Sequence, residues 1–314
     1  MQLSDRIGRQ MKLHDLHVLM AVVQTGSMNK AAGLLNTGQS AISRSIADLE
    51  RTVGVRLLDR NPKGVEPTEY GRALLDGGAA VFDNLRQAVK SIEFLADPTA
   101  GQVRIGSSAL LAASFVSDLI DRLSRRYPRI VFHLATGYMD TLHRELSERN
   151  VDLLIVRRFD PFADEQLDFE FLFDESFVVA AGARNQWVRR RRIELADLAN
   201  EPWVLPPPES VIGSIAKEAF RASGLDYPRT TVVTDSPQVR VSLLATGRFV
   251  TIFPASALRF PAGPPGIKVL PVQLPTARLQ NGIITLKNRM LGPVAKLFIE
   301  HARELAKPLT KHQR

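Results

Sequence analysis

The sequence predicts an α/β protein of more than one domain, with a group of short helices at its N-terminus. Three observations lead to this prediction. The 314 residues exceed the length of one ordinary domain. Within the first 54 residues, apolar side chains recur at helical spacing. After residue 100, short β-branched runs alternate with helical segments, a pattern typical of α/β sheets.

Composition excludes several classes of protein. The chain has no cysteine, so disulfides and thiolate metal sites are excluded, and its 6 histidines form no metal-binding motif. We therefore expect no metal and no cofactor. No apolar run is long enough to span a bilayer, and the first ten residues lack the apolar segment of a signal peptide, so we expect no membrane partner and a cytoplasmic protein. Phosphate-binding loops, nucleophile elbows and paired carboxylates are also missing, so we expect no enzyme and no catalytic residues.

Three amphipathic helices are predicted near the N-terminus. The apolar positions of the first are Leu16, Leu19, Met20 and Val23. Gly26 ends this helix, and Ser27 is a good N-cap for the second. The second helix repeats the spacing with Met28, Ala31, Ala32 and Leu35. After a short turn at 36–38, the third helix buries Ile42, Ile46 and Leu49 and ends at Gly54. This arrangement is a helix-turn-helix.

The exposed face of the third helix has the chemistry needed to read DNA. Its first turns carry Gln39, Ser40, Ser43 and Arg44. Glutamine can pair with adenine, arginine with guanine, and serine with a base or a phosphate. Beyond the helix, residues 57–65 are predicted to form a wing whose Arg60 and Lys63 lie along the phosphate backbone. The alternative is a three-helix packing module with a solvated polar face.

A longer pattern covers this whole region. From Leu16 to Gly71 the chain reads L-x-x-L-x-x-V-x-x-x-G-S-x-x-x-A-A-x-x-L, then G-Q-S-A-I-S-R-S-I-x-x-L-E-x-x-x-G, then L-L-D-R and P-T-E-Y-G. The string resembles the LysR-type transcriptional regulators. The resemblance implies a winged helix-turn-helix that contacts DNA through Ser27, Gln39, Ser40, Ser43 and Arg44, with Arg60 and Thr68 near the wing. Three residues depart from the family pattern, namely Gly38, Leu58 and Pro67.

A single long helix is predicted from Tyr70 to Ala96. Its apolar seam alternates steps of four and three, with Leu74, Gly78, Val81, Leu85, Ala88, Ile92 and Leu95. Such a seam is typical of a short coiled coil, although the helix could instead pack on its own domain. We favour dimerisation, because a palindromic operator needs two reading heads at fixed spacing. The resemblance implies the same role for this helix, in a homodimer or homotetramer. Residues 97–101 are predicted to end the helix and form a hinge.

The rest of the chain is predicted to form parallel α/β sheets. The expected strands lie at 103–105, 131–134, 153–156, 178–181, 204–205, 231–233 and 250–253, with a last helix at about 292–306. The order resembles the family's two-lobed effector domain, which is like periplasmic binding proteins. We thus expect a winged helix-turn-helix at 1–69, a linker helix at 70–97 and an effector domain at 98–314. Lobe one would take about 101–174 and 275–307, and lobe two about 175–274.

An effector is expected at the carboxyl ends of the strands, between the lobes. The candidate residues in lobe one are Ser107, Ser108, Thr136, Gly137 and Arg157; those in lobe two are Pro206, Ser236 and Phe253. Hydroxyls, backbone N–H groups and an arginine suit an anionic or hydroxyl-rich ligand. The alternative is that Ser108 and Ser236 are helix caps and that Arg157 and Arg158 are surface charges. The stretch I-E-F-L-A-D-P-T-A-G resembles a subgroup that includes regulators of galactose-binding-protein genes, which implies a sugar or sugar acid before an aromatic acid.

Charge alone does not locate the DNA-binding surface. The net charge is +8, but residues 1–100 carry 12 Lys+Arg against 11 Asp+Glu. The run of arginines at 189–192 fits a solvated loop better than a DNA contact. An architectural DNA binder would have a basic N-terminal domain, and a solute-binding protein or enzyme would not need the helix-turn-helix. We therefore expect a transcriptional regulator whose partners are promoter DNA, a small sugar or organic acid and, as a further candidate, RNA polymerase.

Overall fold

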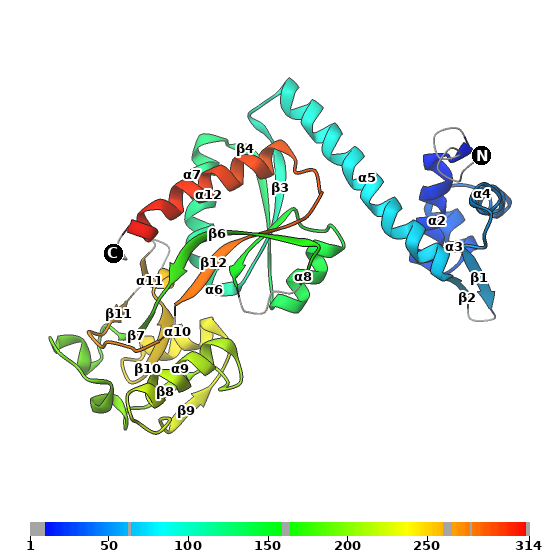
Figure 1. Ribbon diagram of the computed structural model, residues 1–314. Coiled ribbons are helices and arrows are strands. Elements are labelled where there is room, and N and C mark those ends of the chain that lie inside the picture. The colour runs from blue at the N-terminus through cyan, green and yellow to red at the C-terminus, as the bar shows by residue number, and fades with distance from the viewer. Residues whose placement is uncertain (1–9, 62–63, 159–163, 260–265, 277, 312–314) are drawn as a thin grey trace. The chain divides into compact units, whose positions relative to one another are not determined.

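The computed structural model describes residues 10–61, 64–158, 164–259, 266–276 and 278–311. The chain divides into two compact units, Met1–Val89 and Lys90–Arg314, and the division falls inside the long helix α5 (Glu69–Ala96). Figure 1 shows the elements of each unit. Among the described residues, no helix combines the length and the apolar character that crossing a membrane requires.

The N-terminal unit is built from three short helices and a hairpin. These elements are α2 (Leu13–Thr25), α3 (Met28–Leu34), α4 (Gln39–Val53), β1 (Leu58–Asn61) and β2 (Gly64–Pro67). The predicted helix ends are confirmed. Gly26 and Gly54 take left-handed φ angles of 65° and 79° after α2 and α4, and the Ser27 hydroxyl accepts from the Lys30 N–H. The predicted apolar stripes meet in one core, in which Leu19, Ala31 and Ile46 are fully buried.

The predicted wing is the antiparallel hairpin β1–β2, in which Arg60 pairs with Val65. The hairpin is fixed to the helices because the Val65 N–H donates to the Gly26 carbonyl at 3.0 Å. Gly64 allows this approach: a Cβ there would lie 2.7 Å from the same carbonyl oxygen. The wing is therefore anchored at the turn between α2 and α3. Lys63, predicted at its tip, lies outside the described residues.

The long helix is confirmed, and its seam has two parts. Toward its N-terminus, Gly78 is buried against Leu16, and Leu74 packs on the core of the N-terminal unit. Further along, the apolar side chains are exposed: Val81 by 41%, Leu85 by 44%, Val89 by 53%, Ile92 by 67% and Leu95 by 82%. Packing on its own domain therefore accounts for only the first part of the seam.

The C-terminal unit contains two five-stranded sheets. The first has the order β4-β3-β5-β12-β6, with β3 (Ala100–Ser107), β4 (Arg129–Thr136), β5 (Leu153–Arg157), β6 (Leu167–Glu175) and β12 (Leu279–Leu286). The second has the order β11-β7-β10-β8-β9, with β7 (Phe177–Gly182), β8 (Trp203–Leu205), β9 (Thr230–Val233), β10 (Val250–Pro254) and β11 (Ile267–Val269). The chain passes from the first sheet to the second between β6 and β7, and returns between β11 and β12.

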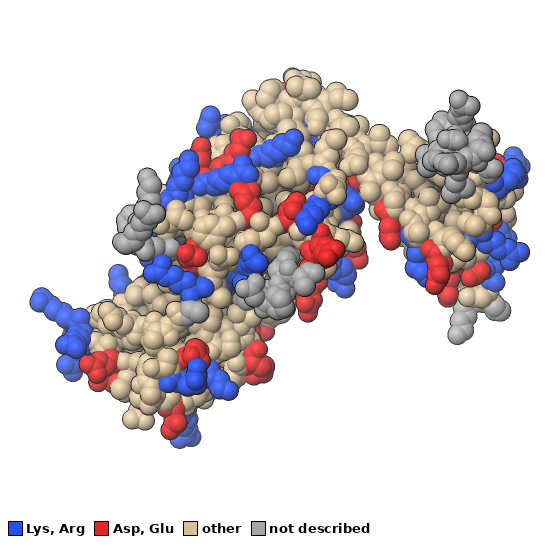
Figure 2. All heavy atoms as spheres, viewed as in Figure 1, with Lys and Arg blue, Asp and Glu red and all other residues tan. Residues whose placement is uncertain are grey.

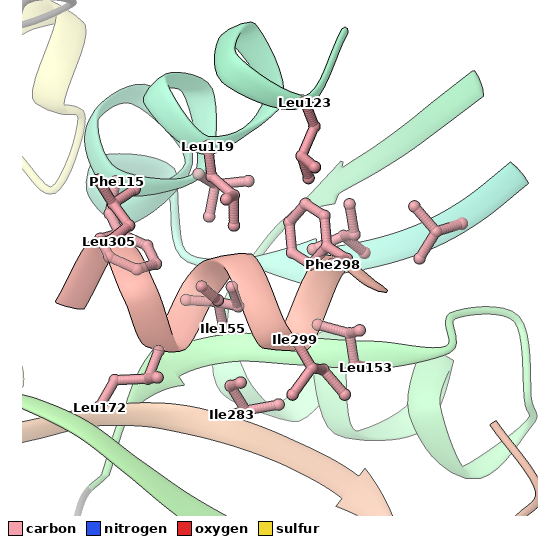
Figure 3. Packing of buried hydrophobic residues seen from close by; sticks show 14 of the residues in the cluster. Phe115, Leu119, Leu123, Leu153, Ile155, Leu172, Ile283, Phe298, Ile299 and Leu305 are labelled. Atoms are coloured by element: carbon pink, nitrogen blue, oxygen red, sulfur yellow. The ribbon is translucent and has the colours of Figure 1, made fainter. Parts of the chain in front are cut away.

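Helices cover these sheets. Those of the first sheet are α6 (Ala109–Leu111), the π-helical turn η1 (Ala112–Val116), α7 (Ser117–Arg126), α8 (Met139–Ser147) and α12 (Pro293–Lys311). Those of the second are η2 (Gln186–Arg189), η3 (Leu195–Leu198), α9 (Val211–Ala222), α10 (Pro237–Ala245) and α11 (Ser256–Arg259). Figure 3 shows how Phe298 and Leu305 of α12 pack with Phe115 and Leu119 beside the strands of the first sheet. These large buried side chains make each sheet a rigid base for the loops at its edge.

The prediction of parallel sheets is wrong in part. Strands β3, β4 and β5 are parallel, as are β8, β9 and β10. However, β12 runs antiparallel to both β5 and β6, and β7 runs antiparallel to β10 and β11. Strands β6, β11 and β12 were not predicted. Both sheets are therefore mixed. β7, where the chain enters the second sheet, and β12, where it returns to the first, each run against the direction of their neighbours.

Candidate functional site

The first candidate site is the exposed face of α4. Gln39, Ser40 and Arg44 are exposed and Ser43 is half-buried, whereas Ile42, Ile46 and Leu49 of the same helix are buried in the core. The polar side chains therefore lie on the side of α4 that faces away from the unit's core. Because Gly38 is the N-cap, no side chain caps the first turn of α4. Its free N–H groups and these side chains form one polar surface.

Two of the predicted DNA contacts, Ser27 and Thr68, form hydrogen bonds within the N-terminal unit. Ser27 caps α3 through its hydroxyl. The Thr68 hydroxyl donates to the Arg56 carbonyl at 2.8 Å and accepts from the Gly71 N–H at 3.0 Å, which joins the end of the wing to the start of α5. Arg60 is exposed on β1. The structure thus brings the α4 residues together on one surface, and it gives Ser27 and Thr68 roles in the fold as well.

Charge does not single out this surface. The face of the N-terminal unit in Figure 2 carries both basic and acidic side chains. In the C-terminal unit, all four arginines of the run at 189–192 are exposed, and Arg192 lies 3.6 Å from Glu194. This agrees with the expected solvated loop. Any reading of DNA by α4 would therefore depend on the placement of a few side chains and not on a broad basic patch.

The second candidate site is a cavity of about 670 Å³ in the C-terminal unit, which is the size of many small-molecule sites. Residues that follow strands of both sheets line it. Ser108 follows β3, Gly137 follows β4 and Arg157 ends β5, while Pro206 follows β8 and Ser236 lies after β9. The cavity is thus at the carboxyl ends of parallel strands from both sheets, where open α/β sheets bind ligands.

Most of the predicted effector residues line this cavity. Those that do are Ser108, Thr136, Gly137, Arg157, Pro206 and Ser236. Ser107 does not, because its side chain is fully buried and its hydroxyl donates to the Ile155 carbonyl at 2.7 Å. Phe253 does not either; its ring is buried and lies 4.6 Å from the Arg240 guanidinium carbon. A contact of either side chain with an effector remains a prediction.

The alternatives left open for these residues can now be separated. Ser236 is an N-cap, since its hydroxyl accepts from the Val239 N–H at 3.4 Å. Ser108 stands at the start of α6, but its hydroxyl caps nothing and is buried without a partner among the described residues. The interpretation of Arg157 as a surface charge is wrong, because only 5% of the residue is exposed.

A hydrogen bond joins two residues that line the cavity. The Tyr138 hydroxyl, at the start of α8, donates to Oδ2 of Asp235, which precedes α10. Tyr138 is exposed, and this bond to the Asp235 carboxylate raises the pKa of the phenol. The phenol therefore stays protonated as a donor at neutral pH. This bond ties an element beside the first sheet to one beside the second.

Two family models match the chain over most of its length. The model described as "Bacterial regulatory helix-turn-helix protein, lysR family" matches residues 13–72, and the "LysR substrate binding domain" matches residues 96–307. The second match alone covers more than half of the chain. The chain belongs to the LysR family of bacterial transcriptional regulators. It is thus a DNA-binding regulator with an effector-binding domain.

Relatives and solved structures of the LysR family agree. The chain is 28% identical to the HTH-type transcriptional regulator GbpR of Azospirillum brasilense, covering 94% of this chain and 86% of that one. It is also 28% identical to the transcriptional dual regulator GltC of Bacillus subtilis, covering 96% and 100%. Full-length OxyR from Pseudomonas aeruginosa, a cysteine-to-aspartate variant, has 21% identity and a TM-score of 0.65, covering 97% and 99%. At that identity, the last likeness shows the fold alone.

Sequence reasoning missed several residues of this LysR-type cavity, and Arg240 is the most deeply buried charged residue among them. Arg240 lines the cavity and is 1% exposed. It lies inside α10, four residues after the cap Ser236, so the helical pattern gave no sign that it is buried. A signal was available in the composition of that helix: an arginine within a short, mostly apolar segment that begins at a strand end. Arg157 was a candidate for a different reason, its place at the end of a predicted strand.

Proposed function

We propose that this LysR-type regulator reads a promoter operator through the exposed face of α4 and the wing, and that a small molecule in the cavity between its sheets controls it. The proposed domains are 1–69, 70–97 and 98–314. One observation carries the DNA contacts: Gln39, Ser40 and Arg44 are exposed on a helix whose other face is buried. Helix-turn-helix proteins place such a surface in the major groove.

The exposed apolar side chains of α5 support a dimeric assembly. Leu85, Ile92 and Leu95 expose 44%, 67% and 82% of their surface. A second copy of α5 would remove these side chains from water and hold two reading heads at a fixed spacing. We propose a homodimer or homotetramer that acts in the cytoplasm, without catalysis of its own, on double-stranded operator DNA. RNA polymerase would be a further partner at the promoter.

The proposed control is a population shift. The cavity lies between two sheets that are joined by two crossings of the chain, so a ligand that contacts both sheets favours one arrangement of the lobes. A change in that arrangement would alter the spacing of the DNA-reading heads in the assembly. The effector must therefore bind the two arrangements with different affinity.

Replacing Arg44 tests the DNA-reading surface. Genomic fragments that the purified protein binds would first define an operator. Arg44→Ala should then weaken operator binding by about 1–3 kcal/mol, the usual contribution of a side chain that reads a base pair. Its effect on random DNA at the same salt should be smaller.

The control is Arg51→Ala, about two turns further along the same helix and beyond the first turns that carry the proposed contacts. Arg51 is exposed and pairs with Asp48 at 2.8 Å, an exposed ion pair that contributes little to stability. We expect this variant to bind the operator like the wild type. Equal losses for Arg44→Ala and Arg51→Ala would contradict the proposed surface.

A further inference from the structure

The cavity contains buried hydrogen-bond donors that no residue of the described chain satisfies. They are Nε and Nη2 of Arg157, Nε of Arg240 and the hydroxyl of Ser108. Both arginines are more than nine-tenths buried, at 5% and 1% exposure, and all three residues line the same cavity. Nearly all buried donors in proteins have a hydrogen-bond partner, so a group of donors without one in a single cavity indicates a missing acceptor.

The positive charge of this group is only partly balanced: the exposed Glu209 and Asp235 also line the cavity, and the Asp235 carboxylate already accepts from Tyr138. The nearest carboxylate to Arg157 is Glu175, and the Nη2–Oε2 distance of 4.0 Å is too long for a hydrogen bond. The Glu175 oxygens already accept from the N–H and hydroxyl of Ser256 and from the Asn281 amide. This carboxylate is therefore engaged by the strands and loops that join the two sheets, and it only partly offsets one arginine.

Among the described residues, no buried carboxylate contacts Arg240. Its Nη1 donates to the Ile252 carbonyl at 3.2 Å, and its guanidinium lies over the Phe253 ring. Burial and the charge of Arg157 lower the pKa of Arg240 to about 10, although the Asp235 carboxylate opposes this shift, so Arg240 remains charged at neutral pH. Two cations thus face one cavity and repel each other, and an anion between them would remove that repulsion.

We propose that Arg157 and Arg240 form an anion receptor and that the effector is a small organic acid whose carboxylate both guanidinium groups bind. This inference rests on the proposed effector site and names its ligand class. A carboxylate fits the planar donor fork of arginine. The remaining lining includes Leu110, Met139 and Ile212, which suit the carbon skeleton of such an acid. A neutral sugar would supply no negative charge to either arginine, so of the expected ligands the acids are favoured.

Matched ligands test the proposal on the full-length protein without DNA. The probes are D-galacturonate against D-galactose, and benzoate against benzamide, with inorganic phosphate as a third anion. Calorimetry and thermal melting at constant ionic strength would measure binding.

We expect at least one acid to bind and to raise the melting temperature, with an affinity at least ten-fold above that of its neutral partner. Failure of both acids to stabilise the protein, or equal binding of acid and neutral partner, overturns the proposal. Stronger binding of phosphate than of either acid overturns the carboxylate assignment.

A variant separates anion binding from folding. Arg240→Met keeps most of the side-chain volume; it loses the bond to the Ile252 carbonyl but also removes one of two repelling charges, so it should remain folded and melt close to the wild type. Its affinity for the acid should nevertheless fall at least ten-fold. Arg248→Met, an exposed arginine outside the cavity, is the control and should bind the acid unchanged. Undiminished acid binding by Arg240→Met overturns the proposal.

The outcome can be distinguished from a failure of the proposed function. Operator binding is measured on the same protein without any acid. If the operator is bound but the acids are not, the anion receptor is wrong and the DNA-reading surface stands. If an acid is bound as expected but no operator is found, the anion receptor stands and the DNA-reading surface is wrong.

Discussion

At the scale of single residues, two glycines of the N-terminal unit differ in whether a side chain would fit in their place. Gly38 begins α4 with a φ of −80°, and a Cβ added there would come no closer than 3.8 Å to the Ser40 hydroxyl. Gly71, by contrast, packs so closely on the loop before β1 that its Cβ would lie 2.1 Å from the Leu57 carbonyl oxygen. Only the second glycine is therefore required by sterics.

Gly38→Ser should stabilise the protein slightly. The serine hydroxyl would accept a hydrogen bond from an N–H in the first turn of α4, which has no side-chain cap. Serine exceeds glycine at this position by a few tenths of a kcal/mol, about the smallest shift that urea unfolding resolves. Gly71→Ala is the contrast and should clearly lower the unfolding midpoint. A loss of stability in Gly38→Ser, similar to that of Gly71→Ala, would show that the cap geometry described here is wrong.

At the scale of elements, the helices could be predicted from the sequence and several strands could not. Helices α2 to α4 were predicted because each has an apolar stripe bounded by glycine or serine, and α5 was predicted from its heptad seam. Strand β12 was missed because Asn281-Gly282, a dipeptide typical of turns, stands in its middle. There Asn281 is buried and donates to Glu175, and the sheet register shifts between the two residues. Tertiary contacts thus override the local turn preference.

Strand β6 did carry a usable signal. Phe169, Phe171 and Phe173 recur at every second position, which is the period of a strand. Among the residues that line the cavity, too, some could be predicted from the sequence and others could not. Ser108 and Arg157 could be predicted because they follow recognisable strands, whereas the burial of Arg240 depends on how α10 packs over Phe253 and Ile252. The sequence offers only an arginine within a mostly apolar helix as a signal of that burial, and the packing itself follows from the fold.

The exposed apolar part of α5 predicts how the assembly can be dissociated. Replacing Ile92 and Leu95 together with glutamate should dissociate the assembly, because four charged side chains would meet in each dimer interface. Sedimentation of the variant at micromolar concentration should give the mass of one chain. Lys90→Glu is the matched control, since position 90 lies about 140° around the helix from Leu85. A variant that sediments like the wild type would exclude this part of α5 as the dimer seam.

At the scale of the whole molecule, composition and function are not related in a simple way. The positive net charge is concentrated after residue 100, in the part of the chain that contains the cavity, whereas the helix-turn-helix is nearly neutral. Within the C-terminal unit, the important positive charges are the buried Arg157 and Arg240, which contribute nothing to a surface patch. Long-range attraction to DNA therefore has to come from the assembly as a whole, and specificity from a few placed side chains.

The bond between Tyr138 and Asp235 is the contact through which the state of the cavity can be tested. It crosses between elements beside the two sheets, so it stabilises the arrangement of the lobes described here. Tyr138→Phe removes only the hydroxyl. An exposed hydrogen bond contributes about 1 kcal/mol or less, so an acid that binds this arrangement should bind up to about five-fold more weakly. By linkage, operator affinity measured without acid should move toward that of the other arrangement, because the free variant populates the acid-binding arrangement less. Calorimetry and operator titrations with and without the acid measure both quantities. Tyr127→Phe, outside the cavity, should change neither. If Tyr138→Phe binds the acid as the wild type does, closure through this bond is not part of effector binding.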